Sequence, residues 1–267
     1  MKYHNTLDAV TYFQTAAENS ALYYQGFALA ELRLIAELAR RRGAGQKDST
    51  FYVVSDCDET LLDNSAYNSW LIETGRDFHD LSWSEWCQRR EAVATPGSLE
   101  FAKFVVEHGA GLMYVSSRFE ADREATADNL RTLGFPLQNA SPDPQVTALF
   151  LSGMVIDGTP SKKGAQFAYL AQRFGAAPMI HLGDNLSDHD ANRYGSKVPA
   201  PERLARAQQD DHRWGSDWIV FPNSIYGTWR NTLSAADEAP PAPFQEGPVR
   251  PSAAEAPKMA LLRRWKP

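Results

Sequence analysis

VVSDCDETLLDNSAY, residues 53–67, is the stretch of sequence that decides the fold of this protein. It joins an apolar run that begins at Phe51 to two aspartates, Asp56 and Asp58. Such a run is typical of a short buried strand, and residues two apart on a strand point the same way. Ligands of open parallel sheets collect beyond the carboxyl ends of the strands. The stretch therefore predicts a parallel α/β fold with two carboxylates that could hold a metal, attack a substrate and move protons.

Two other interpretations of the paired aspartates fit the sequence less well. A calcium-binding loop needs a glycine at its sixth position and a glutamate at its twelfth, where this sequence has Leu61 and Tyr67. A solvated surface turn would not normally have apolar pairs on both sides, because those pairs require burial. A catalytic site at the end of a strand remains the better interpretation.

A second apolar run ends in hydroxyl groups. Residues 112–118, LMYVSSR, repeat the pattern of a strand followed by polar side chains. Ser116 can donate a hydrogen bond to a phosphate oxygen, and Ser117 or Arg118 can assist it. By itself this segment is also compatible with a purely structural turn.

Two later segments offer a lysine and another acidic pair. Residues 161–164, SKKG, precede an apolar helix, and an ammonium placed there could neutralise a nucleophile and a phosphate together. Residues 179–190, MIHLGDNLSDHD, follow a short apolar run and contain Asp184 and Asp188. This spacing suits a metal-binding loop.

The order D-x-D-E-T, S-S-R, lysine and G-D-x-x-x-D resembles the haloacid-dehalogenase superfamily. DCDETLLDNSAY, YVSSR, HLGDNLSD and WIVFPNSIYGTW (218–229) look more closely like the bacterial class C acid phosphatases, which include outer-membrane lipoprotein nucleotidases. The resemblance spans roughly residues 10–232. It implies an α/β fold: a Rossmann-like haloacid-dehalogenase core whose parallel sheet is flanked by helices, plus a small helical cap and N-terminal helices.

The resemblance also implies catalytic roles. Asp56 would be the nucleophile that forms an aspartyl-phosphate, and Asp58 the general acid and base. Ser116 would bind phosphate. Lys163 corresponds to the family lysine better than its neighbour Lys162, because the family places that lysine three residues before an arginine.

Magnesium is the implied cofactor. Asp184 would bind it together with Asp56 and the backbone carbonyl of Asp58. Asp188 would act through a water molecule, or by contacting the residues that bind the metal. Three positions depart from the family pattern: Gln166 replaces the arginine that follows the lysine, Cys57 replaces a branched aliphatic residue, and Ser117 replaces an asparagine. The departures at Gln166 and Ser117 affect substrate selectivity and phosphate affinity rather than the groups that the chemistry requires.

The implied activity is magnesium-dependent hydrolysis of phosphomonoesters, with nucleoside 5′-monophosphates and aryl phosphates as substrates. Phosphodiesterase, phosphonatase or phosphotransferase chemistry on the same scaffold is a second interpretation. A third is a non-catalytic surface protein that binds a small ligand. Such a binder has no need for these acidic and basic residues in this order.

The chain divides by composition into four parts. We expect an N-terminal helical segment at 1–48, a catalytic core at 49–66 and 109–232, a cap at 67–108 and a Pro-rich C-terminal arm at 233–267. Within the first part, residues 15–42 predict an amphipathic helix or helix pair with Leu32, Ile35 and Leu38 on one side. The end of the arm carries Leu261, Leu262 and Trp265, which could anchor it on the body or on a second subunit.

Four aromatic residues are candidates for contact with a nucleotide base. The resemblance suggests Tyr67, Trp83 and Trp86 of the cap, and Tyr226, near the mouth of the site. Flat apolar rings can sandwich a base. Packing within the cap is the alternative role.

Composition limits the partners. A net charge of −6 and a pI near 5.6 argue against nucleic acid or an anionic membrane as the main partner. The sequence contains no apolar run of the ~18 residues that a spanning helix needs. We expect a small-molecule phosphomonoester as partner, and a homodimer is possible. The resemblance implies a periplasmic, outer-membrane-attached or secreted protein, whereas a gene that starts at Met1 would favour the cytoplasm.

Overall fold

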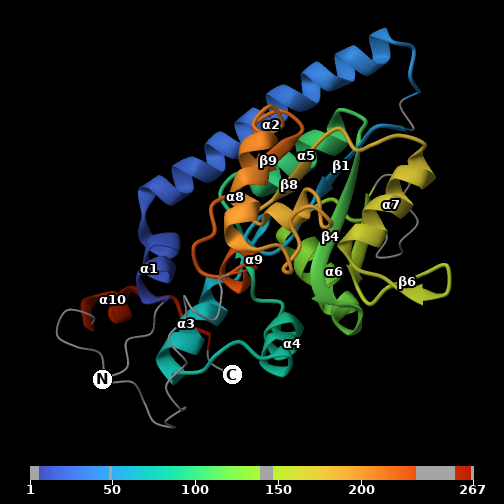
Figure 1. Cartoon of the computed structure of the whole chain (residues 1–267). Helices are drawn as coiled ribbons and strands as arrows, with labels where there is room; N and C mark the ends of the chain where they lie inside the picture. The colour runs from blue at the N-terminus through green and yellow to red at the C-terminus, as the bar shows by residue number, and fades with distance from the viewer. Residues whose placement is uncertain (1–5, 48–49, 139–146, 233–255, 266–267) are drawn as a thin grey trace.

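A parallel β-sheet forms the centre of the molecule (Figure 1). The computed structural model describes residues 6–47, 50–138, 147–232 and 256–265. In this part of the chain a five-stranded sheet has the order β5-β4-β1-β8-β9, and every neighbouring pair is parallel. Its strands are β1 (Tyr52–Ser55), β4 (Gly111–Phe119), β5 (Thr147–Ser152), β8 (His181–Gly183) and β9 (Trp218–Val220). The predicted α/β fold is confirmed.

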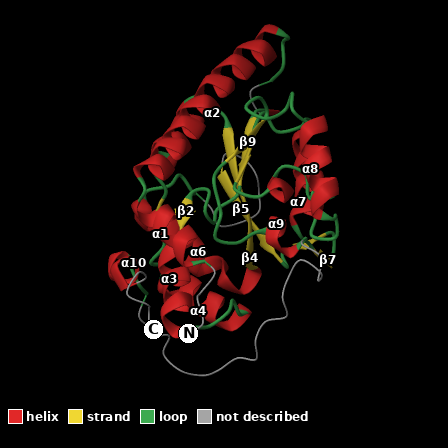
Figure 2. Ribbon diagram, turned by 60° about the vertical axis from the view of Figure 1, so that its left-hand side comes forward, coloured by secondary structure: helices red, strands yellow, loops and turns green. Residues whose placement is uncertain are grey.

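Helices cover both faces of the sheet. Figure 2 shows α2 on one side of the strands and α7 and α8 on the other. Val53 of β1 belongs to the core beneath α2, whereas Tyr52 and Val54 belong to the core beneath α7. This alternation follows from the two-residue period of a strand. The helices of these layers are α2 (Ala17–Gly43), α5 (Ser98–Glu107), α6 (Arg123–Leu133), α7 (Lys163–Phe174) and α8 (Ala200–Gln209).

The N-terminal segment forms a helix pair, α1 (Leu7–Thr15) and α2, which meet at Ala16. The predicted apolar face is right for Leu38, which is buried, but wrong for Leu32 and Ile35, which are 71% and 43% exposed. The buried residues follow helical three- and four-residue spacing instead. They are Asn19, Tyr23, Phe27, Ala30, Leu34, Leu38 and Arg41.

A helical region lies beside one end of the sheet (Figure 1) and includes α3 (Ser65–Thr74) and α4 (Asp80–Arg89). The short strand β2 (Leu62–Asp63) pairs antiparallel with β3 (Val93–Ala94), so the chain leaves the core and returns to it side by side. Helix α5 packs on α2 and β4, although it falls within the predicted cap. The division into core and cap stays a prediction.

The C-terminal segment returns to the body of the molecule. Helix α10 (Ala256–Leu261) contacts α1, and the side chains of Leu262 and Trp265 are buried. The ring centroid of Trp265 lies 4.8 Å from that of Trp70. The predicted anchor on the body is confirmed for Leu262 and Trp265 but wrong for Leu261, which is 60% exposed. Residues 233–255 and 266–267 of the predicted arm lie outside the described residues.

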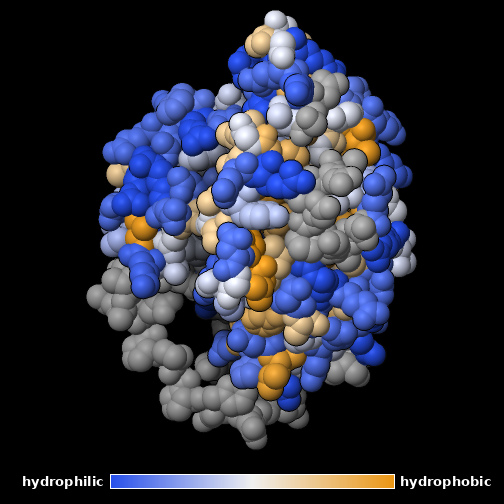
Figure 3. All heavy atoms as spheres, turned by 90° about the vertical axis from the view of Figure 1, so that its right-hand side faces the viewer, coloured by the Kyte–Doolittle hydropathy of each residue, from blue (hydrophilic) through white to orange (hydrophobic). Residues whose placement is uncertain are grey.

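The remaining elements are short. They are η2 (Glu120–Asp122), β6 (Val155–Ile156), β7 (Thr159–Pro160), η3 (Leu186–Asp188) and α9 (Thr228–Asn231). Figure 3 views the molecule from the side of α7 and β6, where hydrophilic residues surround a central strip of apolar ones. Within the described parts of the chain, no helix has the length and apolar character needed to cross a membrane.

Candidate active site

The loop after β1 holds the first two aspartates in a tight turn. The backbone N–H groups of Leu61 and Leu62 both donate to the carbonyl oxygen of Cys57, each at 2.8 Å. Glu59 has a φ of 54°, in the left-handed region that few residues other than glycine adopt. Its side chain is fully buried and accepts a hydrogen bond from the backbone N–H of Asn64 at 2.8 Å. These bonds keep the strained turn in one conformation.

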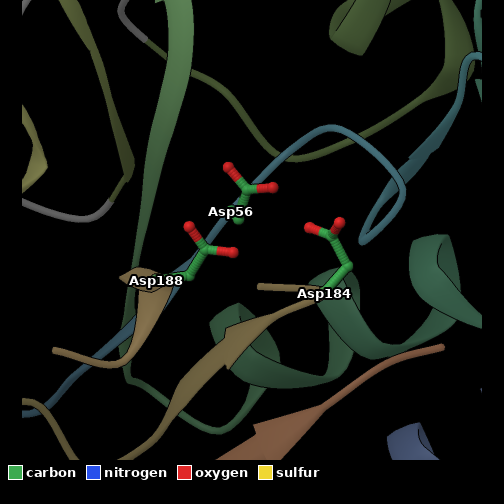
Figure 4. Close-up of side chains that lie close together, drawn as sticks. All are labelled: Asp56, Asp184 and Asp188. Carbon is green, nitrogen blue, oxygen red and sulfur yellow. The ribbon is translucent and has the colours of Figure 1, made fainter. Parts of the chain in front are cut away.

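Three carboxylates converge beyond the carboxyl ends of β1 and β8. Asp56 follows β1, and its backbone N–H donates to the carbonyl of Leu182 in β8 at 2.9 Å. Asp184 follows β8, and Asp188 ends the short helix η3. One oxygen of each carboxylate lies within 4.8 Å of the others, and Figure 4 shows the three groups facing a common space. Adjacent parallel strands thus bring together residues that are more than a hundred positions apart.

Lys163 supplies the positive charge at this cluster. It is the first residue of α7, and its Nζ lies 2.5 Å from Asp56 Oδ1 and 2.6 Å from Asp188 Oδ1. Burial lowers the pKa of Lys163, but the two carboxylates outweigh it and raise the pKa overall, so the ammonium stays charged. Lys162, by contrast, is exposed. The structure therefore places Lys163, and not its neighbour, in the site.

One lysine does not neutralise three carboxylates, of which Asp56 and Asp188 are buried and Asp184 is partly buried. Burial raises the pKa of Asp56 well above its ordinary value, and the charges of Asp188, Asp184 and Asp58 raise it further against the opposing effect of Lys163. Burial, followed by the charge of Asp188, raises the pKa of Asp184 to about 7. Such mutual repulsion is relieved when a cation binds. Oxygen ligands of this kind suit a hard cation such as Mg²⁺.

Backbone and amide groups orient the two aspartates that follow β8. The backbone N–H of Asn185 donates to Asp188 Oδ2 at 3.0 Å. Asn223 Nδ2 donates to Asp184 Oδ2 at 2.7 Å, while its Oδ1 accepts from the backbone N–H of Ile225 at 2.9 Å. Because the amide oxygen is already held by a donor, the amide nitrogen must face Asp184.

Gly183 leaves room for the Asp188 carboxylate. A Cβ added to Gly183 would lie 2.4 Å from the Cβ of Asp188 and 2.6 Å from its Oδ2. Contacts this short are not tolerated, so Asp188 or the loop would have to move. Small displacements of positioned groups can cost about 10²-fold in rate.

We expect Gly183→Ala to lower kcat/KM by about 10- to 100-fold and to weaken divalent-metal binding, because Asp188 is displaced from Lys163. Steady-state kinetics and calorimetric metal titration measure both effects. Gly164→Ala is the matched control, because its Cβ would make only an ordinary contact, 3.5 Å from Asn192 Oδ1. Parent-like kinetics in both variants would contradict the steric argument.

Ser116 and Asp58 lie together at the ends of β4 and the β1 loop. Ser116 is buried, and its Oγ lies 3.0 Å from Asp58 Oδ2. Arg118 Nε donates to Asp58 Oδ1 at 2.9 Å, and the arginine is only 1% exposed. The alternation along β4 leaves Ser117 exposed. Of the three polar residues predicted here, Ser116 and Arg118 point inward and contact the second aspartate.

The predicted aromatic residues separate into two groups. Tyr67 of α3 and Trp83 and Trp86 of α4 are buried. The ring centroids of Tyr67 and Trp83 lie 5.2 Å apart, and Tyr67 Oη contacts Ser82 Oγ at 2.9 Å. Tyr226 is only partly buried. The contacts of Tyr67, Trp83 and Trp86 are those of rings that pack against one another. Tyr226 is more accessible than these three rings.

Gln166, which replaces the family arginine, is buried and hydrogen-bonded to neighbouring protein groups. Its side chain is fully buried, and Nε2 donates to the carbonyl of Leu151 at 2.7 Å and to Ser161 Oγ at 3.2 Å. These bonds tie the first turn of α7 to the end of β5. The replacement of the family arginine thus places a neutral amide in a buried site, where a charge would need a partner.

Sequence reasoning missed two asparagines. Asn64 contacts Asp58, and Asn223 contacts Asp184. Both lie inside segments quoted for their resemblance, DNSAY and FPNSIYG. Their position within or near the motifs could have marked these asparagines as candidates. Nothing in the sequence indicates which carboxylate each of them contacts.

Comparison with known proteins identifies the family. Residues 2–229 match the family described as HAD superfamily, subfamily IIIB (acid phosphatase). The structure is similar to that of the class C acid phosphatase from Bacillus anthracis, with a TM-score of 0.72 and 29% identity over 96% of this chain and 94% of that chain. The structure of that class C acid phosphatase with tungstate bound gives the same values. The chain therefore belongs to the acid phosphatases of HAD subfamily IIIB and is a hydrolase of phosphomonoesters.

Proposed function

We propose that this protein is a magnesium-dependent phosphomonoesterase in which Asp56 is the nucleophile, Asp58 the general acid and base, and Lys163 the fixed positive charge. The observation that carries the proposal is the position of Asp56. It lies directly after the central strand, with its carboxylate 2.5 Å from the Lys163 ammonium and close to the carboxylates of Asp184 and Asp188.

The acidic cluster fits a magnesium ion. Asp56 and Asp184 offer carboxylate oxygens, the backbone of Asp58 offers a carbonyl, and Asp188 would act through water or through Lys163. Magnesium prefers oxygen ligands and keeps several waters. When bound, it would draw charge from the phosphate and hold one of its oxygens in place. The raised pKa values of Asp56 and Asp184 support a cation at this position.

In the first step a carboxylate oxygen of Asp56 attacks phosphorus in line with the leaving oxygen. The bond between phosphorus and that oxygen breaks, its electron pair stays on the oxygen, and a proton from Asp58 completes the alcohol. Lys163 and Ser116 offset the charge on the phosphate oxygens. The product of this step is an aspartyl-phosphate on Asp56.

In the second step water attacks the phosphorus of the aspartyl-phosphate. Asp58, now ionised, takes a proton from that water while the bond between phosphorus and the Asp56 oxygen breaks. The carboxylate of Asp56 is restored and phosphate leaves. One residue thus serves both as acid and as base.

Phosphate release tests the proposal directly. We would assay an aryl phosphate and several nucleoside 5′-monophosphates, each with Mg²⁺ and with EDTA. Tungstate, which the Bacillus anthracis structure contains, is a tetrahedral oxyanion and should inhibit in competition with the substrate. Release that is unaffected by EDTA, or by saturating tungstate, would count against the proposed centre.

Metal binding should depend on pH. The pKa of Asp184, about 7, means that a proton must leave before the ion binds at lower pH. The apparent affinity for Mg²⁺ should fall on the order of tenfold for each pH unit below about 7. Calorimetric titration across this range measures the trend.

The same group predicts a trend in stability. Without metal, folded Asp184 keeps its proton between the ordinary value of 3.8 and about 7, so the free energy of unfolding falls as pH rises through this window. Bound Mg²⁺ removes that loss. The rise in Tm on adding Mg²⁺ should therefore be larger near pH 8 than near pH 5. Equal rises would contradict the assignment.

We also propose that nucleoside 5′-monophosphates are substrates and that Tyr226 contacts the base. Tyr226 lies three residues after Asn223, which binds Asp184, and its ring is partly accessible. Base stacking on an aromatic ring is worth about 1–3 kcal/mol. Tyr226→Ala should therefore lower kcat/KM for AMP by about tenfold or more and leave ribose 5-phosphate, which lacks the base, nearly unaffected. Equal losses on both substrates would assign Tyr226 to packing alone.

Location and assembly complete the proposal. The resemblance to class C acid phosphatases supports a site of action outside the cytoplasm, which cell fractionation followed by the phosphatase assay would test. A homodimer is a further proposal, and sedimentation equilibrium of the purified chain would decide it. Activity confined to the cytoplasmic fraction would overturn the first, and a monomer at all concentrations the second.

A further inference from the structure

One oxygen of the Asp58 carboxylate is held by two fixed donors. Arg118 Nε and Asn64 Nδ2 each donate to Asp58 Oδ1 at 2.9 Å. Both donors are buried, Arg118 at 1% exposure and Asn64 at 0%. The other oxygen, Oδ2, contacts only Ser116 Oγ, at 3.0 Å, among the hydrogen bonds of the described residues. The two oxygens of this carboxylate therefore have different environments.

The direction of the Asn64 amide is decided by its other partners. Its Oδ1 accepts from Trp86 Nε1 at 2.8 Å and from Arg118 Nη2 at 3.0 Å. Indole and guanidinium groups are donors only. A flipped amide would place its NH₂ group against these donors and its oxygen against the carboxylate of Asp58. The amide nitrogen is thus directed at Asp58, and Trp86 of the cap contributes to that orientation.

We propose that Arg118 and Asn64 are positioning residues that hold Asp58 Oδ1 in place, so that Oδ2 alone carries the proton to the leaving group and from the attacking water. This inference rests on the proposed role of Asp58 as general acid and base. A carboxylate pinned at one oxygen presents the other in a single direction, which removes the entropic cost of orienting it in the transition state.

Ser116, the hydrogen-bond partner of Asp58 Oδ2, is consistent with a held Oδ1 and a reactive Oδ2. The hydroxyl of Ser116 has one proton, which it can give to one acceptor at a time. In this structure it faces Asp58 Oδ2. When a phosphate oxygen takes that proton, Oδ2 loses its protein partner and becomes free to face the leaving oxygen. Oδ1 keeps both of its donors throughout.

The test is the dependence of rate on the leaving group. A basic leaving alcohol needs a proton in the transition state, whereas 4-nitrophenolate leaves readily without one. We would measure kcat/KM for a series of substituted phenyl phosphates and one alkyl phosphate, using the parent, Asp58→Asn, Arg118→Gln and Asn64→Ser, all with saturating Mg²⁺. This ratio reports the step that forms the aspartyl-phosphate.

We expect Arg118→Gln and Asn64→Ser to lower kcat/KM for the alkyl phosphate by about 10- to 100-fold and for 4-nitrophenyl phosphate by less than about threefold. Asp58→Asn should show the same selective loss in larger measure. In the Asp58→Asn background, either substitution should change kcat/KM by less than about twofold, because both residues act through Asp58.

Two controls separate positioning from folding. Arg203→Gln removes another buried arginine, whose guanidinium donates to the carbonyl of Tyr194, and it should keep the leaving-group dependence of the parent even if it lowers Tm. Trp86→Phe removes the indole N–H that orients Asn64 and keeps a smaller aromatic ring at the same position. This variant should lower kcat/KM for the alkyl phosphate, relative to that for 4-nitrophenyl phosphate, by about 3- to 10-fold. If Arg118→Gln does not fold, Trp86→Phe still tests whether the orientation of the Asn64 amide affects the reaction.

The outcomes are distinct. A parent with no activity on any phosphate ester would overturn the proposed function itself. An active parent whose Arg118 and Asn64 variants lose activity equally on all leaving groups would overturn the positioning role alone. Additive losses in the Asp58→Asn background would do the same, because they would show an action that bypasses Asp58.

Discussion

We expect Asp56→Asn to release phosphate on the order of 10⁵-fold more slowly than the parent, or not at all, as for the removal of nucleophiles in other enzymes with covalent intermediates. The amide has no anionic oxygen to attack phosphorus, and the aspartyl-phosphate cannot form. The fold should survive. Asp56 is one of three crowded carboxylates, so a neutral group relieves repulsion while Lys163 keeps Asp188 as partner.

Phosphate release with saturating Mg²⁺ and the Tm of both proteins measure these effects. Asp56→Ala is a necessary companion, because deamidation of the introduced asparagine would restore a trace of the parent enzyme, whereas alanine cannot revert. Trapping of radiolabelled phosphate on the parent, but on neither variant, would locate the intermediate. Substantial turnover by the alanine variant would remove Asp56 from the mechanism.

Lys163→Met should lower kcat/KM by about 10²- to 10³-fold, the range for loss of one preorganised electrostatic group. It should also reduce stability, because Asp56 and Asp188 lose the ammonium that both contact. Removal of one partner of a buried ion pair costs about 3–5 kcal/mol. Added Mg²⁺ should recover part of the stability, since it supplies positive charge to the same cluster, but not the lost catalysis.

Lys162→Met is the matched control for this substitution. It changes the adjacent residue in the same way, yet Lys162 is exposed and precedes the first turn of α7. Its kinetics and Tm should match those of the parent. Equal losses in the two variants would indicate a general effect of charge near α7 rather than a specific contact with Asp56.

Sequence patterns were sufficient to predict that the polar groups after the strands meet in the candidate site. Asp56, Ser116 and Asp184 each follow an apolar run, and parallel strands end at one edge of a sheet. Local patterns of this kind do not depend on the rest of the chain. The same reasoning indicated a lysine before an apolar helix, the family resemblance selected Lys163 rather than Lys162, and the structure brings the Lys163 ammonium to Asp56.

Several side-chain contacts between distant segments were beyond prediction. Arg118 was predicted only to assist Ser116 with phosphate, and nothing in the sequence indicated that the pleat of β4 turns its side chain inward to Asp58. The contacts of the aromatic residues Trp86 and Trp265 could not be predicted either. Trp86 donates its indole N–H to Asn64, and Trp265, at the other end of the chain, packs near it with ring centroids 5.9 Å apart.

By itself the sequence determined the α/β fold, the order of the motifs and the chemical groups available to the site, because strand and helix periods and side-chain chemistry are local properties. Only the tertiary structure decided which face of α2 is buried, which way Arg118 points and which oxygen of Asp58 is held. Those choices depend on groups that approach from other segments, and a buried polar group takes the direction in which its partners lie.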